Sequence, residues 1–272
     1  ATDARWVTIP TNASLTNKMV AFLEDILPKF PNTYFRLTFS IEGIGEAHDK
    51  LRSMPGSYKK IQKSYDIISP LRKKYSNLVL DCNSVFTASS EIYLLDALKT
   101  INKDFKFDNM SVTYARGIIK DESLKNVSKK RYKLINEFLE SREKNKEKRL
   151  LYPLWRGVNS VSRENLMRTV FDDEFVSSCV AGRKLLVVSE TGEVQPCEIL
   201  GKSFGNLRDH DWDLKSLLKK NSVNQLQKWI KDTKCKCSFE CALAANVVWK
   251  PKNYPKVVSS ALKNIGKNHL NH

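Results

Sequence analysis

The sequence predicts an α/β fold in which a parallel sheet flanked by helices precedes a small α+β domain rich in cysteine. Strand-like and helix-like segments alternate four times in the first half, and such repeated βα units need crossover connections that make the strands parallel. After Leu150 the segments become short, and five of the six cysteines fall in the last third of the chain. We therefore expect one domain over residues 1–160 and a second, with a basic tail, over residues 161–272.

Four strands and four helices are expected in the first half. Alternating apolar residues indicate strands, and apolar residues at helical spacing indicate helices. The strands are expected over Arg5–Pro10, Tyr34–Ile41, Leu78–Phe86 and Met110–Ala115. The helices are expected after a Ser14 cap, over about Ser57–Tyr75, from a Ser89 or Ser90 cap through Leu98, and over about Ser128–Arg149.

The second half contains a predicted hairpin, two short helices and a tight loop. Arg183–Gln195 has two apolar stretches around Gly192, which predicts two strands joined by a turn. Asp213–Lys219 and Ser222–Lys231 are amphipathic, which predicts short helices. Cys235–Cys241, with three cysteines, is expected to be a tight loop.

Polar residues lie where each predicted strand of the first half ends. Parallel sheets of α/β folds bind ligands at the carboxyl ends of their strands. The residues at these ends are Thr11–Asn12, Ser40–Gly43, Asn83 and Arg116–Gly117. We expect a ligand at this edge of the sheet.

The chain is strongly basic. Lys and Arg number 46 against 30 Asp and Glu, a formal net charge of +16. The excess is mostly Lys mixed with Glu along predicted helices, which favours a solvated surface over a nucleic-acid footprint. No apolar run reaches about 18 residues, so no membrane-spanning helix is expected. The first residues lack the pattern of a secretory signal, and we expect a cytoplasmic location and no membrane partner.

The clustered cysteines indicate a metal centre. Disulfide frameworks belong to short secreted chains with small cores, whereas this chain is long and rich in apolar residues. The first pair is spaced too widely for a zinc knuckle, and iron–sulfur clusters accept more varied spacings, so we expect a [4Fe–4S] cluster rather than zinc. The expected ligands are Cys179, Cys197 and Cys241, with the fourth from Cys235 or Cys237.

The sixth cysteine, Cys82, lies inside an apolar strand. A cysteine in such a place is more often a small buried residue than a ligand, and we expect that here. Among the four histidines, which show no metal spacing, His48 is expected to order the loop before Arg52.

Three motifs of the last third occur together. They are Cys-x12-Gly-x4-Cys from Cys179 to Cys197, Phe-Gly-Asn-Leu from Phe204, and the segment Lys234–Cys241. This combination resembles the SPASM/twitch extension of radical S-adenosylmethionine (SAM) enzymes, which binds auxiliary iron–sulfur clusters.

The first half resembles the same family independently. Thr11–Asn12 is similar to the family's threonine-asparagine-glycine strand end, and Phe39–Gly43 to its serine-x-acid-glycine strand. Gly45–Gly56 is similar to the loop and helix that follow. The resemblance covers about residues 5–250, in the order of the family.

The resemblance implies a TIM-like partial barrel that uses SAM. A [4Fe–4S] cluster on a Cys-x3-Cys-x2-Cys loop cleaves SAM to a 5′-deoxyadenosyl radical, which abstracts hydrogen from a substrate, here expected to be a peptide. A donor such as ferredoxin or flavodoxin supplies electrons. By resemblance, Ser40 and Glu42 lie near the ribose or amino group of SAM and Asn83 near its ribose or adenine. Arg52 reaches its carboxylate, which a guanidinium can bind with two hydrogen bonds.

The sequence departs from the family in one essential feature, because it contains no Cys-x3-Cys-x2-Cys. As written, the chain is expected not to cleave SAM. The barrel is expected to lack its first two βα units, about 60 residues. Two explanations stay open: a fragment of a radical SAM oxidoreductase or maturase, or a chain that has lost radical chemistry. The start without Met favours the fragment.

A different class of function is the alternative. The chain is then a non-catalytic binding module, stabilised by zinc or by an iron–sulfur cluster, whose basic surface binds an acidic or nucleic-acid partner.

Overall fold

The computed structural model describes residues 3–143 and 152–266. It divides into two compact units: unit 1 comprises Ala1–Ala115 and Ser123–Leu139, and unit 2 comprises Arg116–Glu122 and Glu140–His272. The chain therefore enters unit 2 at Arg116, returns at Ser123 and leaves unit 1 again at Glu140. The boundary expected at residue 160 lies inside a helix, Tyr152–Phe171, and stays a prediction.

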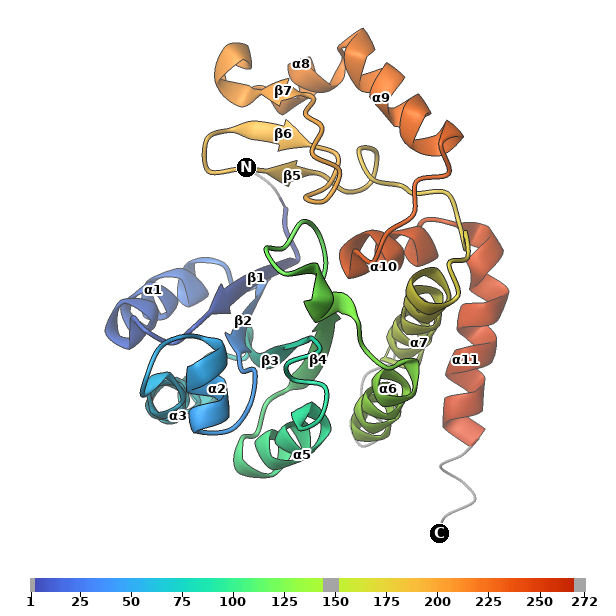
Figure 1. Cartoon of the computed structure of the whole chain (residues 1–272). Coiled ribbons are helices and arrows are strands. Elements are labelled where there is room, and N and C mark those ends of the chain that lie inside the picture. Colours follow the sequence, from blue (N-terminus) through green and yellow to red (C-terminus); the bar gives the residue numbers. More distant parts are fainter. Residues whose placement is uncertain (1–2, 144–151, 267–272) are drawn as a thin grey trace. The chain divides into compact units, whose positions relative to one another are not determined.

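Unit 1 contains the parallel sheet that the sequence predicts (Figure 1). Its strands are β1 (Trp6–Thr11), β2 (Tyr34–Ser40), β3 (Leu78–Phe86) and β4 (Asn109–Tyr114), in the order β1-β2-β3-β4. Every neighbouring pair is parallel. Sequential strands are therefore neighbours, and their carboxyl ends lie at one edge of the sheet.

Helices connect these strands, and α1, α3 and α5 lie along one side of the sheet (Figure 1). The helical segments of unit 1 and its borders are α1 (Thr16–Lys29), α2 (Glu46–Leu51), α3 (Ser57–Ile68), α4 (Leu71–Lys74), α5 (Leu94–Asp104), η1 (Glu122–Lys125) and α6 (Lys129–Glu143). The part of the expected Ser128–Arg149 helix beyond Glu143 lies outside the described residues.

The two faces of the sheet differ in polarity. Leu37 and Phe39 on β2 and Leu80 and Cys82 on β3 share one face, and each is 0% exposed. Cys82 is thus a buried core residue, as expected. Since side chains alternate along a strand, the intervening residues, such as Ser40 and Asn83, lie on the opposite, polar face.

Two predicted helix starts are wrong, and local hydrogen bonds explain both of them. The Ser14 hydroxyl donates to Asn12 Oδ1 at 2.7 Å instead of capping α1, whose cap residue is Leu15. The Ser90 hydroxyl donates to the Val85 and Thr87 carbonyls, and α5 begins only at Leu94. Serine side chains favour such turns over helix interiors.

The expected helix Ser57–Tyr75 is two helices, α3 and α4. Pro70 is the cap residue of α4, with φ −63°, and α3 ends at Ile68. Proline has no N–H to donate and its ring clashes with the carbonyl four residues earlier, so a continuous helix is interrupted here.

Unit 2 contains a helical layer and a small antiparallel sheet. The helical layer contains α7 (Tyr152–Phe171), α10 (Glu240–Val248), η4 (Pro251–Asn253) and α11 (Tyr254–Gly266). Val161, Val247 and Val257 form its core. A Cβ at Gly157 would overlap the Val257 carbonyl, so glycine allows α7 and α11 to approach closely. The sequence analysis missed α7, which is weakly amphipathic.

The small sheet confirms the predicted hairpin. Its strands are β5 (Val187–Val188), β6 (Glu193–Gln195) and β7 (Gly205–Asn206), all antiparallel to their neighbours. Gly192 adopts φ +88° in the turn between β5 and β6, a conformation that favours glycine. The two-residue β7 was not expected, because so short a strand leaves no alternating pattern.

The remaining helices of unit 2 are η3 (Leu207–His210), α8 (Leu214–Leu218) and α9 (Asn221–Asp232). The predictions of α8 and α9 are confirmed to within a residue at each end. Within the two described ranges, no helix combines the length and apolar character that crossing a membrane needs.

Asn77 joins α1 and the loop after it to β3, and its removal provides a test of the fold. The buried amide Nδ2 donates to the carbonyl oxygens of Leu27, Phe30 and Thr33, at 3.1, 3.0 and 3.2 Å. Asn77→Ala leaves buried carbonyls without a donor, and we expect the free energy of unfolding to fall by about 2 kcal/mol in urea titration. The control Asn17→Ala, at an exposed site, is expected to change it by less than about 0.5 kcal/mol. Equal effects of both variants would contradict this role.

Candidate functional site

Glu42 is a buried carboxylate just beyond the carboxyl end of β2, and only 6% of it is exposed. Oε1 accepts a hydrogen bond from Arg52 Nη2 at 2.8 Å, and Oε2 accepts one from the Val85 backbone N–H at 2.6 Å. Burial raises the pKa of Glu42, while the Val85 N–H and the Arg52 guanidinium act to lower it. One side chain thereby connects the end of β2 with β3 and with the end of α2.

His48 fixes the backbone at Glu42. Its ring is 1% exposed, and Nδ1 accepts a hydrogen bond from the Glu42 backbone N–H at 3.0 Å. Nδ1 therefore carries no proton. Burial, and then the positive charge of Arg52, lower the pKa of His48 to about 4, although Asp49 acts to raise it. The expectation that His48 orders the loop before Arg52 is confirmed.

Asp49 closes the same segment onto α3. Oδ1 accepts hydrogen bonds from the Tyr58 backbone N–H at 2.7 Å and the Ser57 hydroxyl at 2.8 Å, and Oδ2 accepts one from the Gly56 N–H at 2.6 Å. The hydrogen bonds from Tyr58 and Ser57 lower the pKa of Asp49. Glu42, His48, Asp49 and Arg52 together are called the Glu42 network below.

Ser40 and Asn83 are paired in the sheet register, so both lie on the polar face beside this network. Asn83 Oδ1 accepts hydrogen bonds from the Ser111 hydroxyl at 2.8 Å and the Thr113 hydroxyl at 3.0 Å. This fixes the amide, and its Nδ2 makes no hydrogen bond to the described residues. The structure thus brings the four residues predicted for SAM binding to one edge of unit 1: Ser40, Glu42, Arg52 and Asn83.

The end of β1 contributes a tight turn to the same edge. The Thr11 hydroxyl accepts from the Ala13 N–H at 3.0 Å, and Asn12 Oδ1 accepts from the Ser14 N–H at 3.1 Å. Ala13 adopts φ +61°, a conformation that favours glycine. Ala13 stands where the threonine-asparagine-glycine pattern has its glycine, so the backbone there has a conformation suited to that pattern.

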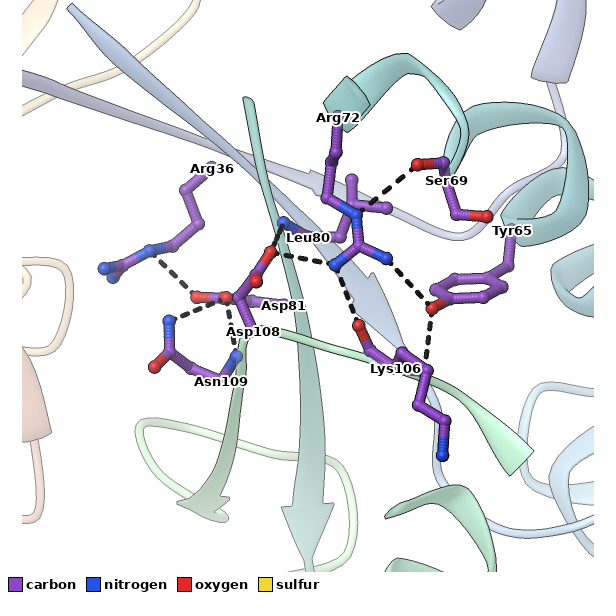
Figure 2. A network of polar contacts seen from close by, with 9 residues as sticks. All are labelled: Arg36, Tyr65, Ser69, Arg72, Leu80, Asp81, Lys106, Asp108 and Asn109. Atoms are coloured by element: carbon purple, nitrogen blue, oxygen red, sulfur yellow. Dashed lines mark hydrogen bonds and ion pairs between the residues drawn. The ribbon is translucent and has the colours of Figure 1, made fainter. Parts of the chain in front are cut away.

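A second polar network lies toward the amino ends of β3 and β4 (Figure 2). Arg36 Nε lies 2.8 Å from Asp81 Oδ2, and Asn109 Nδ2 donates to Asp81 Oδ1 at 2.9 Å. Asp108 Oδ2 accepts from the Leu80 N–H at 2.8 Å and pairs with Arg72. The charged groups of this network lie in ion pairs with one another, and the sequence analysis assigned no role to them. We interpret this network as structural.

Four cysteine side chains meet in one apolar cluster of unit 2. Cys179 and Cys197 are buried, and the half-buried Cys235 and Cys237 pack against the same cluster. Burial raises the pKa of the Cys237 thiol to about 11; the Phe239 N–H opposes this, and the other three thiols add to it. The four cysteines thus belong to, or pack against, one apolar cluster.

Hydrogen bonds fix the segment that carries Cys179. The Val180 N–H donates to the buried Asn246 Oδ1 at 2.8 Å, and Arg183 Nη2 donates to the Cys179 carbonyl at 2.7 Å. Gln227 Nε2 donates to the Gly182 carbonyl at 2.7 Å. Helices α9 and α10 therefore hold this backbone from two directions.

Cys241 occupies a different environment. Cys241 lies in the first turn of α10 rather than in the expected loop, and it is exposed. Partial burial raises the pKa of its thiol, and the Arg116 guanidinium acts to lower it. The prediction that Cys241 is a ligand alongside Cys179 and Cys197 stays a prediction.

The donor set fits a soft metal centre, because four thiols in an apolar surrounding are typical ligands of iron–sulfur clusters and of zinc. All six cysteines are free. Among the described residues, no three His, Cys, Asp or Glu side chains are grouped closely enough to hold a metal ion. A zinc ion requires every sulfur within about 2.3 Å of one point, whereas a cluster of four irons spreads its thiolates more widely.

The fold is similar to that of radical SAM enzyme structures. A structure of anSMEcpe with bound AdoMet has a TM-score of 0.52 and 17% identity, over 97% of this chain and 71% of that one. A structure of anSMEcpe with bound AdoMet and the Cp18Cys peptide has a TM-score of 0.51 and 18% identity, over 97% and 74%. No protein-family model and no curated protein matches the chain. At such identities the likeness concerns the fold.

The buried His48 makes the stability of unit 1 sensitive to pH. An unfolded histidine takes up a proton near pH 6.5, whereas folded His48 does so only near pH 4, so the unfolded state binds more protons between these values. Stability is therefore expected to fall by about 2 kcal/mol from about pH 7 to about pH 5. Burial raises the pKa of Glu42, so protonation of Glu42 stabilises the folded state as the pH falls and opposes the effect of His48.

The variant His48→Asn separates these contributions, because its amide oxygen can still accept from the Glu42 N–H but does not titrate. Urea titrations at both pH values should show a smaller loss of stability for His48→Asn than for the wild type. His210→Asn, at a half-buried histidine of unit 2, is the control and should keep the wild-type pH dependence. If His48→Asn keeps it as well, the ring is not the cause.

Proposed function

We propose that the chain belongs to a radical SAM enzyme that modifies a peptide and that unit 2 binds an auxiliary [4Fe–4S] cluster. The observation that carries this proposal is the packing of four cysteines in or against one apolar cluster, in a chain whose fold is similar to that of radical SAM enzyme structures. The similar protein anSMEcpe, an anaerobic sulfatase-maturating radical SAM enzyme, has been crystallised with AdoMet and a peptide, which supports a peptide substrate.

The polar edge of unit 1 is the proposed contact for SAM. The Ser40 hydroxyl and the Asn83 Nδ2 have no partner among the described residues and can donate to ribose or adenine acceptors. Arg52 keeps N–H groups beyond the one that binds Glu42, and these can bind the SAM carboxylate. Glu42 then orients Arg52 and accepts from the amino or ribose groups. The resulting site uses side chains that the Glu42 network already holds in place.

Bound SAM supplies a 5′-deoxyadenosyl radical once an electron reaches it. The 272 residues contain no Cys-x3-Cys-x2-Cys, so they do not provide the thiolates of the cluster that delivers that electron. The proposed contribution of this chain is therefore SAM positioning by unit 1 and an auxiliary cluster in unit 2. A ferredoxin or flavodoxin is the proposed electron donor, and the net charge of +16 suits such an acidic partner.

Anaerobic reconstitution with iron and sulfide tests the auxiliary cluster. We expect about four irons and four sulfides per chain, with broad absorption near 400 nm, for the wild type and for the control Cys82→Ser, whose sulfur is a core atom. Cys197→Ser removes a thiolate and should lose most of this absorption. A colourless wild type that binds one zinc instead would contradict the proposal and favour the zinc-stabilised binding module.

The same assay identifies the ligand set. The packing of unit 2 favours Cys179, Cys197, Cys235 and Cys237 as the ligands. Cys237→Ser is then expected to lose the cluster, and Cys241→Ser to retain it. The reverse result would support Cys241 as a ligand and Cys237 as a spectator.

Equilibrium dialysis with labelled SAM tests the proposed SAM contacts. Ser40→Ala removes one donor without disturbing a hydrogen bond of the described residues, and we expect the dissociation constant to rise about three- to tenfold. Ser76→Ala, at an exposed serine, is the matched control and should bind like the wild type. Equal binding by both variants would place the SAM contacts elsewhere.

A further inference from the structure

Arg116 connects the two segments that carry most of the cysteines. Its Nε donates to Glu198 Oε1 at 2.7 Å, and its Nη1 donates to Glu240 Oε2 at 2.9 Å. Glu198 directly follows Cys197, and Glu240 directly precedes Cys241. The Arg116 guanidinium therefore links the residue that follows Cys197 to the first residue of α10.

The surroundings of Arg116 favour this arrangement. Its side chain is 23% exposed, that of Glu240 is 28% exposed and that of Glu198 is 45% exposed, so water competes less for the hydrogen bond to Glu240 than for the one to Glu198. The guanidinium also lies over the Phe239 ring, 4.8 Å from its centroid. Charge-assisted hydrogen bonds and a cation–π contact both strengthen when they are shielded from solvent.

Phe239 extends this contact to the thiols. It is 3% exposed and belongs to the apolar cluster that contains Cys179 and Cys197 and packs against Cys235 and Cys237. Arg116 therefore packs on a member of the cluster that contains the cysteines, and it contacts the residue after Cys197 and the residue before Cys241. The sequence analysis placed Arg116 at a strand end, but nothing in the sequence links it to Glu198 and Glu240.

We propose that Arg116 is a positioning residue for the auxiliary cluster. It fixes the distance between the Cys197 segment and the segment that ends at Cys241, and its charge offsets the negative charge of the cluster. This inference rests on the proposed function, because it concerns the same centre.

The charge of Arg116 has a consequence that a purely structural contact would not have. Four thiolates give a [4Fe–4S] cluster a net negative charge, which increases by one when the cluster is reduced. A nearby cation stabilises the reduced form more than the oxidised form, and so raises the reduction potential. Removing Arg116 therefore lowers the reduction potential, and the two carboxylates left unpaired near the cluster lower it further.

Redox titration of the reconstituted full chain, followed by electron paramagnetic resonance, tests the inference. Arg116→Gln is expected to shift the reduction equilibrium at least tenfold toward the oxidised form, which is about 59 mV lower for one electron. Glu198→Gln keeps an acceptor for Arg116 Nε but removes a negative charge, and it should shift the potential upward. Arg116→Lys keeps the charge but loses the two-pronged geometry, and should lower the cluster content more than the potential.

The matched control is Arg168→Gln. Arg168 forms a local ion pair with Glu174 at 2.6 Å in the same unit. It is expected to have wild-type cluster content and potential.

The outcomes separate this inference from the proposed function. A wild type that binds no cluster overturns the proposed function, and this inference with it. A wild type that binds the cluster, with Arg116→Gln and Glu198→Gln unchanged in potential and content, overturns only the role of Arg116. If Arg116→Gln fails to retain a cluster, the test rests on the reduction potential of Glu198→Gln. A potential that does not rise in Glu198→Gln then also overturns the role of Arg116.

Discussion

The organisation of unit 1 depends on the burial of the Glu42 carboxylate. A buried carboxylate is costly unless it is paired and hydrogen-bonded. Glu42 meets this requirement with Arg52 and with the Val85 N–H, so the end of β2, the end of α2 and β3 are held together. His48 then holds the Glu42 backbone through a ring that must stay neutral. The hydrogen bonds that the buried Glu42 carboxylate requires thus fix the polar edge that is proposed to bind SAM.

Unit 2 meets a comparable requirement around its cysteines. The four thiols lie in or against an apolar cluster, and burial raises the pKa of the Cys179, Cys235 and Cys237 thiols, so forming thiolates there requires compensating positive charge. A metal centre supplies such charge, and metal binding is then coupled to the release of protons. Arg116 lies at the side of this cluster with two carboxylates. Both units thus use an arginine to join segments that are separate in the sequence.

The sequence predicted the elements whose pattern is repeated and local. The four parallel strands, the hairpin around Gly192 and helices α8 and α9 were expected close to their observed bounds. The predicted starts of α1 and α5 were wrong, because the Ser14 and Ser90 hydroxyls form hydrogen bonds within turns instead of capping the helices. Helix α7 was missed because its apolar residues follow no clear helical period. Its existence depends on packing against α11, with close approach at Gly157.

The sequence by itself determined the parallel α/β architecture and the gathering of cysteines, because periodicity and spacing are written locally. The candidates Ser40, Glu42, Arg52 and Asn83 came from its resemblance to a family. Only the tertiary structure decided which side chains meet. It brought Cys179, Cys197, Cys235 and Cys237 into one cluster, set Cys241 beside Arg116, and paired Arg116 with Glu198 and Glu240. Hydrogen bonds and ion pairs between distant residues depend on how the backbone brings segments together, and spacing along the chain does not record that.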